Sequence, residues 1–145
     1  LHSRVALSNI YGLVKMGANV KVCGPPHLIQ KNIEILGIEK TYNVDDLIEW
    51  ADAINVLRIQ RERMGIGIIP SIREYRDLFG ITNERLNNHK KDLVIMHPGP
   101  MNRGVEIDSK VADGDQAIIL DQVLNGVAVR MSVLYLLLGG GEFEK

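Results

Sequence analysis

The sequence predicts an α/β fold, a doubly wound parallel sheet with helices on both faces (Rossmann-like). Short segments typical of strands alternate with helical patterns along the chain, which is typical of parallel strands joined by helical crossovers. Residues 53–59 and 93–98 read as buried strands, and 19–24 reads as a strand with Val20 and Val22 on one face. No repeat, low-complexity segment or linker interrupts this order, so the 145 residues are expected to form one domain.

The helical segments follow from the spacing of apolar residues and from their end signals. The first helix is expected to end at Gly17. Further helices are expected over 27–37, 45–51, 71–80, 83–91 and 120–138. Asp45 is a plausible N-cap, and Ser71 with Glu74 predicts a capping box.

Composition excludes several function classes. With 17 basic and 18 acidic residues, the net charge of −1 gives no global field for nucleic acid or an anionic membrane. The single cysteine, Cys23, excludes a disulfide framework and fits a reducing compartment, so a cytoplasmic location is expected. The apolar stretch near the C-terminal end, VLYLLLGGG, is too short and too close to polar residues to span a bilayer, which predicts a soluble protein. The chain begins with Leu1 instead of a methionine, and its first residues already have a helical pattern. We therefore expect it to be part of a longer protein, with a segment that precedes residue 1.

Polar side chains gather where predicted strands end, which is where parallel sheets bind ligands. Arg58 and Gln60 project to one side if the strand at 53–59 continues, and Glu62 can hold Arg58 in its rotamer. A rigid guanidinium beside an amide suits a carboxylate. The alternative is a solvated helix face with an ordinary pair between Arg58 and Glu62, and spacing alone favours that alternative.

Arg4 lies near the start of the first helix, where the macrodipole disfavours a positive side chain. An external anion shared with the helix N-terminus would explain the placement. Fraying or simple solvent exposure explains it equally well.

The loop at 97–100 is stiffened by Pro98 and Pro100, which fix two φ angles and remove two donors. Rigid carbonyl acceptors in this loop can be aimed at an N–H of a ligand. The bond before Pro100 can be cis or trans. His97 is either a base or a strand-end residue, and the second interpretation is favoured because no acidic residue that could orient it is identifiable nearby.

Seven motifs follow one another along the chain: HSRVALSN, GPP, LRIQRER, EYRDLFGIT, MHPGPMNRGVEI, VADG and QVLNGVAVRMSVLYLLLGG. In this order they resemble the C-terminal half of the aspartate carbamoyltransferase catalytic chain, and the resemblance covers essentially the whole sequence. The related ornithine enzymes characteristically carry HCLP where this chain has His97 to Pro100. The resemblance therefore favours aspartate.

The resemblance implies that residues 1–145 form an aspartate-binding domain that is incomplete at its N-terminus and lacks its first strand. A preceding domain, absent here, would bind carbamoyl phosphate. In the family the amine of L-aspartate attacks the carbamoyl carbon, a tetrahedral intermediate forms, and phosphate leaves to give N-carbamoyl-L-aspartate, a step toward pyrimidines. Neither metal nor organic cofactor takes part, and the partners implied are the two substrates and a homotrimer of full-length chains, with regulatory subunits left open.

The resemblance also assigns roles to residues of this chain. Arg4 and Arg58 match the arginines that hold the carboxylates of aspartate, Gln60 lies beside them, and Glu62 orients the second arginine. Pro98, Gly99 and Pro100 match the loop whose carbonyls contact the carbamoyl group and the amine. Leu7 replaces a basic residue of many relatives, so one accessory contact is expected to be lost. The alternative is a non-catalytic relative that serves as a binding or assembly module.

Overall fold

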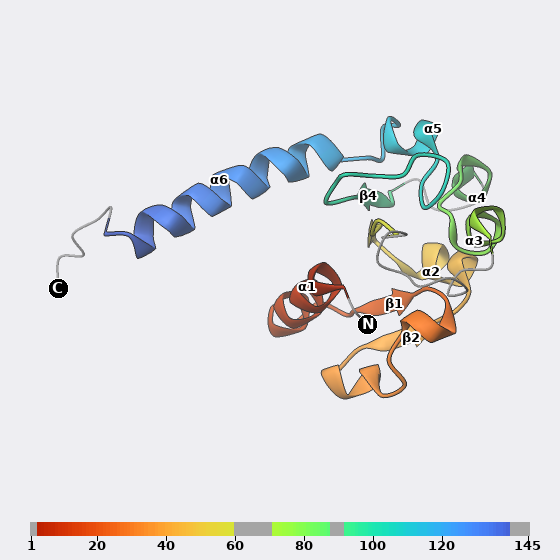
Figure 1. Cartoon of the computed structure of the whole chain (residues 1–145), viewed down its shortest axis with the longest axis horizontal. Helices are drawn as coiled ribbons and strands as arrows, with labels where there is room; N and C mark the ends of the chain where they lie inside the picture. Colours follow the sequence, from red (N-terminus) through yellow and green to blue (C-terminus); the bar gives the residue numbers. More distant parts are fainter. Residues whose placement is uncertain (1–2, 60–70, 88–91, 140–145) are drawn as a thin grey trace.

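The computed structural model describes residues 3–59, 71–87 and 92–139, and the chain has an α/β, Rossmann-like fold (Figure 1). Strand β1 (Lys21–Cys23) pairs in parallel with β2 (Glu39–Thr41), and β3 (Ala53–Asn55) pairs in parallel with β4 (Val94–Met96). Within the described ranges no ladder joins the two pairs, so the single sheet that was expected is seen as two parallel pairs. Strands of three residues present few groups for further pairing.

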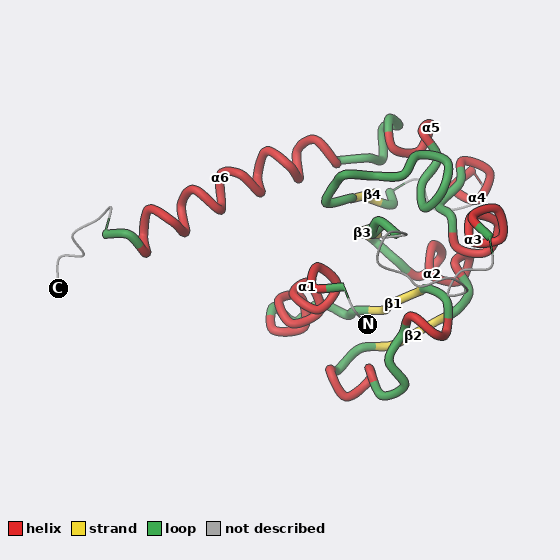
Figure 2. Tube along the Cα trace, viewed as in Figure 1, coloured by secondary structure: helices red, strands yellow, loops and turns green. Residues whose placement is uncertain are grey.

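Helices and short 3₁₀ turns connect the strands (Figure 2). The α-helices are α1 (Arg4–Lys15), α2 (Val44–Trp50), α3 (Ile72–Phe79), α4 (Asn83–Asn87), α5 (Ser109–Ala112) and α6 (Ile119–Leu137), and the 3₁₀ helices are η1 (Pro26–Leu28) and η2 (Ile33–Leu36). The short α5 and β2 were not expected from the sequence, because four and three residues are too few for a periodic pattern to emerge.

The single helix expected over 27–37 is wrong, since that stretch forms η1 and η2 instead. Ile29, Ile33 and Ile38 are all buried in one cluster, and β-branched side chains are weak helix formers, so packing decides the local backbone. Gly37 ends η2 with a φ of 77°, in the left-handed region that glycine tolerates.

Helices α1, α2 and α3 each begin with a side-chain cap. Ser3 accepts a hydrogen bond from the backbone N–H of Ala6, and Ser71 accepts one from Glu74 at 2.9 Å, which confirms the Ser71 part of the predicted box. The expected cap at Asp45 is wrong by two positions. The side chain of Asn43 accepts from the Asp45 N–H at 2.9 Å, so Asp45 lies inside the first turn.

The apolar core has two clusters. The larger one joins α2, β3 and β4 to the segment that precedes α6, and its buried members include Ile48, Ile54, Ile95 and Ile107. The smaller one packs Ile10 of α1 against Ile29, Ile33 and Ile38. The exits of β3 and β4 therefore belong to the larger cluster, whereas α1 belongs to the smaller one.

Helix α6 extends away from the rest of the described chain (Figures 1 and 2). Its first residue, Ile119, is buried, but its later apolar residues are exposed. By length and composition alone the 19-residue helix could cross a membrane, so the expectation that this stretch is too short is wrong. Core helices of soluble proteins pass the same test, and α6 carries Asp121 and Arg130, which are costly in a bilayer.

Candidate functional site

Two segments singled out in the sequence each follow a strand, and both lie at the same edge of the β3–β4 pair. Strands β3 and β4 run parallel with Asn55 opposite Met96, and the Val56 N–H then donates to the Met96 carbonyl at 2.8 Å. Chain direction and register thus place Arg58 and the loop at 97–106, called here the proline loop, at the carboxyl ends of neighbouring strands. That edge is where parallel sheets bind ligands.

A hydrogen bond ties these two segments together. The side-chain amide of Asn102, in the proline loop, donates to the carbonyl of Ile59 at 3.2 Å. Ile59 is buried and immediately follows Arg58, whose side chain is half-buried. The backbone that carries Arg58 is therefore held against the proline loop.

The proline loop is itself fixed by His97 and Gly99. The backbone N–H of His97 donates to Oε1 of Gln122 in the first turn of α6 at 2.8 Å, and the Gly99 N–H donates to Nδ1 of His97 at 2.9 Å. Gly99 has a φ of 63°, which a residue with a side chain rarely adopts. The bond between Gly99 and Pro100 is cis, which settles the alternative left open by the sequence.

A buried acid lies beside this histidine, so the expectation that His97 has no acidic neighbour is wrong. In the part of the chain that the structure describes, His97 and Glu106 are the buried polar or charged residues, at 0% and 1% exposure. Oε1 of Glu106 lies 3.5 Å from Nε2 of His97, which is long for a hydrogen bond, so the carboxylate acts on the ring through its charge. The loop folds back over nine residues, and sequence spacing could not reveal that.

Glu106 also accepts two hydrogen bonds from Asn102, one from its backbone N–H and one from its side-chain amide at 3.2 Å. Burial alone would raise the pKa of the Glu106 carboxyl. The His97 side chain and the Asn102 donors outweigh burial, and the pKa is lowered from its ordinary value. A charged residue between Val105 and Ile107, both aliphatic, was the sequence signal for a buried acid.

The other predicted site residues are placed as follows. Arg4 is the first residue of α1, its side chain is exposed, and its helix packs in the smaller cluster. Leu7 lies one turn further along α1 and is half-buried. Pro98 and Gly99 are half-buried and Pro100 is exposed. Gln60 and Glu62 lie outside the described residues. The structure thus brings Arg58 and the proline loop together, and it places Arg4 on a separate element.

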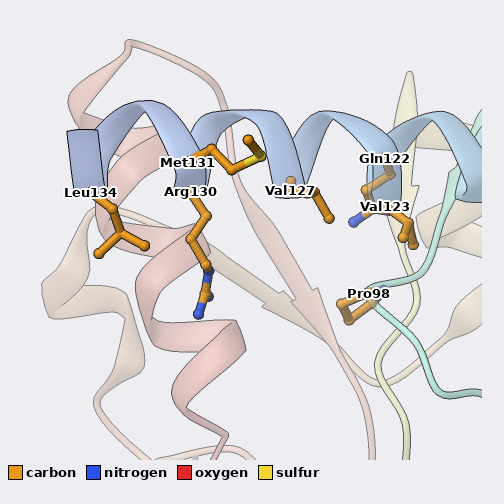
Figure 3. A pocket seen from close by; sticks show the side chains of 8 residues that line it. Pro98, Gln122, Val123, Val127, Arg130, Met131 and Leu134 are labelled. Carbon is orange, nitrogen blue, oxygen red and sulfur yellow. The ribbon is translucent and has the colours of Figure 1, made fainter. Parts of the chain in front are cut away.

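An open hollow of about 490 Å³ lies between Pro98 and one face of α6 (Figure 3). One wall of the hollow is apolar and is formed by Val123, Val127 and Leu134. The side chain of Arg130 extends from α6 at the margin of the hollow. Sequence reasoning did not single out Arg130, although a lone arginine within an apolar helix was a visible signal.

Metal ligands are not clustered in the residues that the structure describes, since no group of three or more His, Cys, Asp or Glu side chains could hold an ion there. The sequence expectation that no cofactor takes part stays a prediction.

Comparison with known proteins places the fold and the sequence in one family. Residues 1–137 match the family described as Aspartate/ornithine carbamoyltransferase, Asp/Orn binding domain. The aspartate carbamoyltransferase catalytic subunit of Gemmatimonas aurantiaca is 62% identical over 140 residues, which are 97% of this chain and 44% of that protein. The subunit of the same name from Carboxydothermus hydrogenoformans is 58% identical over 142 residues, covering 97% of this chain and 46% of that protein.

Solved structures agree on the fold. Ornithine carbamoyltransferase from Thermus thermophilus superposes with a TM-score of 0.74 at 19% identity, covering 90% of this chain and 43% of that one. Aspartate transcarbamoylase from Trypanosoma cruzi in complex with carbamoyl phosphate gives a TM-score of 0.69 at 22% identity, covering 87% of this chain and 44% of that one. The chain spans less than half the length of the curated relatives it matches.

Proposed function

Because this chain belongs to the family of aspartate and ornithine carbamoyltransferases, we propose that it forms the aspartate-binding half of an aspartate carbamoyltransferase. The full-length enzyme transfers the carbamoyl group of carbamoyl phosphate to the amine of L-aspartate, giving N-carbamoyl-L-aspartate and phosphate. A second domain outside this chain binds carbamoyl phosphate. The names of relatives that are 54% to 62% identical support aspartate over ornithine.

The observation that carries the proposal is the contact between Asn102 and Ile59. It holds the backbone next to Arg58 against the proline loop, which supports a site in which the Arg58 guanidinium binds a carboxylate and the loop carbonyls accept from an amine. L-Aspartate carries two carboxylates and one amine, and this pairing complements it.

Each proposed residue has a role that its chemistry suits. Arg58 and Arg4 bind the two carboxylates, Gln60 adds an amide donor, and Glu62 orients Arg58. The carbonyls of the loop from Pro98 to Pro100 accept from the amine and from the carbamoyl group. Holding the amine against the carbamoyl carbon supplies much of the rate, because alignment is achieved on binding rather than at each collision.

Assembly and location belong to the same proposal. The full-length chains form a homotrimer in the cytoplasm, and the reaction needs no metal or cofactor. Light scattering of the purified enzyme gives the mass of the assembly, and activity measured with and without a chelator gives the metal requirement.

A domain exchange tests the function. In what we call the exchange enzyme, this chain replaces the 140 matching residues of the Gemmatimonas aurantiaca relative. With carbamoyl phosphate and L-aspartate it should form N-carbamoyl-L-aspartate, and L-ornithine should give no product. The parent enzyme is the positive control, and this chain alone should be inactive.

A folded, trimeric exchange enzyme that forms no product, beside an active parent, would contradict the proposal. The binding or assembly module would then be the better account.

A further inference from the structure

The backbone amide of Gly99 controls where the Pro98 carbonyl points. Both groups belong to one trans peptide unit, which is planar, so the N–H and the C=O point in opposite directions. The Gly99 N–H is turned inward onto Nδ1 of His97 at 2.9 Å, and His97 is fully buried. The Pro98 carbonyl is therefore aimed away from the His97 ring, on the opposite side of the loop.

This arrangement requires one tautomer of His97. Nδ1 must present its lone pair to accept from Gly99, so in the neutral ring the proton is on Nε2. Nε2 lies 3.5 Å from Oε1 of Glu106, and a buried carboxylate favours a proton on the nitrogen that faces it. A proton on Nδ1 would instead oppose the Gly99 N–H and turn the peptide unit away.

Glu106 in turn is anchored to both segments of the site. It accepts from the backbone and the side chain of Asn102, and the same Asn102 amide donates to Ile59 beside Arg58. The Glu106 carboxylate thus lies beside His97, which orients the proline loop. It also accepts from Asn102, which holds the segment that carries Arg58.

From this geometry we propose that Glu106 is a positioning residue for carbamoyl transfer: through His97 it fixes the direction of the Pro98 carbonyl, and through Asn102 it fixes the separation between that loop and Arg58. The inference rests on the proposed function for its consequence in catalysis. It adds a residue, Glu106, that touches neither substrate. It also gives His97 the role of an acceptor for the loop instead of a base.

The kinetic test uses the exchange enzyme. Glu106→Gln removes the charge that selects the tautomer while keeping the size of the side chain, and kcat should fall by about 10- to 100-fold because the reacting groups are misaligned. The Kd for carbamoyl phosphate should stay within about twofold of the parent value, since that ligand is bound by the other domain. Asp113→Asn is the matched control, because it breaks an exposed ion pair with Arg103 of the same loop and should leave kcat unchanged.

A second variant separates positioning from simple destabilisation. In His97→Asn the side-chain oxygen takes the place of Nδ1 and accepts from Gly99 without any choice of tautomer. The part of the loss that runs through His97 should therefore be absent in the His97→Asn background, so Glu106→Gln should lower kcat by a smaller factor there than in the parent, whereas independent losses of kcat would multiply in full. Multiplying losses, or a Glu106→Gln enzyme with parental kcat, would overturn the inference.

The tautomer of His97 can be measured without an activity assay. In the ¹⁵N spectrum of this chain, His97 should show a protonated Nε2 and an unprotonated Nδ1, and Glu106→Gln should move the proton toward Nδ1. This result together with an inactive exchange enzyme would contradict the proposed function and leave the Glu106–His97 relationship intact. An Nδ1 proton in the unmodified chain would contradict the inference whatever the activity.

Discussion

Asn102 and Ile59 lie 43 residues apart in the sequence, and the Asn102 side-chain amide donates to the Ile59 carbonyl at 3.2 Å. This bond, with the parallel pairing of β3 and β4, brings the Arg58 segment to the proline loop. Each segment alone is an ordinary strand exit. Together they lie on one edge of the fold, and the first prediction concerns Arg58 in one of them.

Arg58→Ala in the exchange enzyme should raise the KM for aspartate and lower kcat, because one charge-assisted carboxylate contact is lost. A cost of about 2 to 4 kcal/mol is expected for such a contact, which is roughly a 30- to 900-fold loss of kcat/KM. Carbamoyl phosphate binding should be nearly unchanged in a direct titration. Arg73→Ala, which removes an exposed arginine of α3, is the matched control, and unchanged aspartate kinetics in Arg58→Ala would remove that residue from the site.

Arg4→Ala should separate binding from stability. The positive side chain at the first position of α1 opposes the helix macrodipole, so its removal should raise the free energy of unfolding of this chain by about 0.3 to 1 kcal/mol. In the exchange enzyme the same change should raise the KM for aspartate. Lys15→Ala, in the last turn of α1, is the control and should have the reverse pattern, with lower stability and an unaltered KM. Equal KM values for Arg4→Ala and the parent would argue that Arg4 is only an exposed surface residue.

Two glycine-to-alanine substitutions should change the free energy of unfolding in opposite directions. A Cβ at Gly80 would lie 2.6 Å from the Arg76 carbonyl oxygen and 3.0 Å from that of Val105, both backbone atoms that cannot move aside cheaply. Gly80→Ala should therefore destabilise this chain by about 1 to 3 kcal/mol. In α1, a Cβ at Gly12 meets nothing within 4 Å, so Gly12→Ala should stabilise by about 0.5 to 1 kcal/mol. Denaturant unfolding measures the free energy of unfolding of both variants. If Gly80→Ala stabilises the chain as much as Gly12→Ala does, local movement has relieved the contact at Gly80.

The stability contributed by Glu106 should depend on pH with a definite sign. Its pKa is lowered in the folded state from an ordinary value of 4.5, so its contribution is fully present above pH 4.5. That contribution is lost as the pH falls through the lower folded value. Around the carboxyl lie His97 and Asn102, and its charge also contributes, after burial, to the raised pKa of Tyr75.

The difference in unfolding free energy between this chain and Glu106→Gln should accordingly be constant from pH 7 to about pH 5 and shrink toward pH 3. Urea titrations at each pH give that difference. A difference that stays constant down to pH 3 would mean that the pKa of Glu106 is not lowered in the folded state.

Local chemistry in the sequence anticipated a good part of the fold. The Ser71 cap, the first helix and the strands at β1, β3 and β4 follow from short-range patterns that tertiary contacts did not override. The stretch at 27–37 shows the limit. Its glycine stop at Gly37 was found, but burial of three isoleucines in a common cluster replaced the expected helix with two 3₁₀ turns.

By itself the sequence determined the family, the alternation of strands and helices, and the candidates Arg4, Arg58, Gln60, Glu62 and Pro98 to Pro100, because residue type and order carry those signals. Only the tertiary structure decided that Glu106 faces His97 and that Asn102 reaches Ile59. Those contacts depend on how a loop folds back and on which strands are neighbours. Packing of the whole core sets both, and no local spacing encodes them.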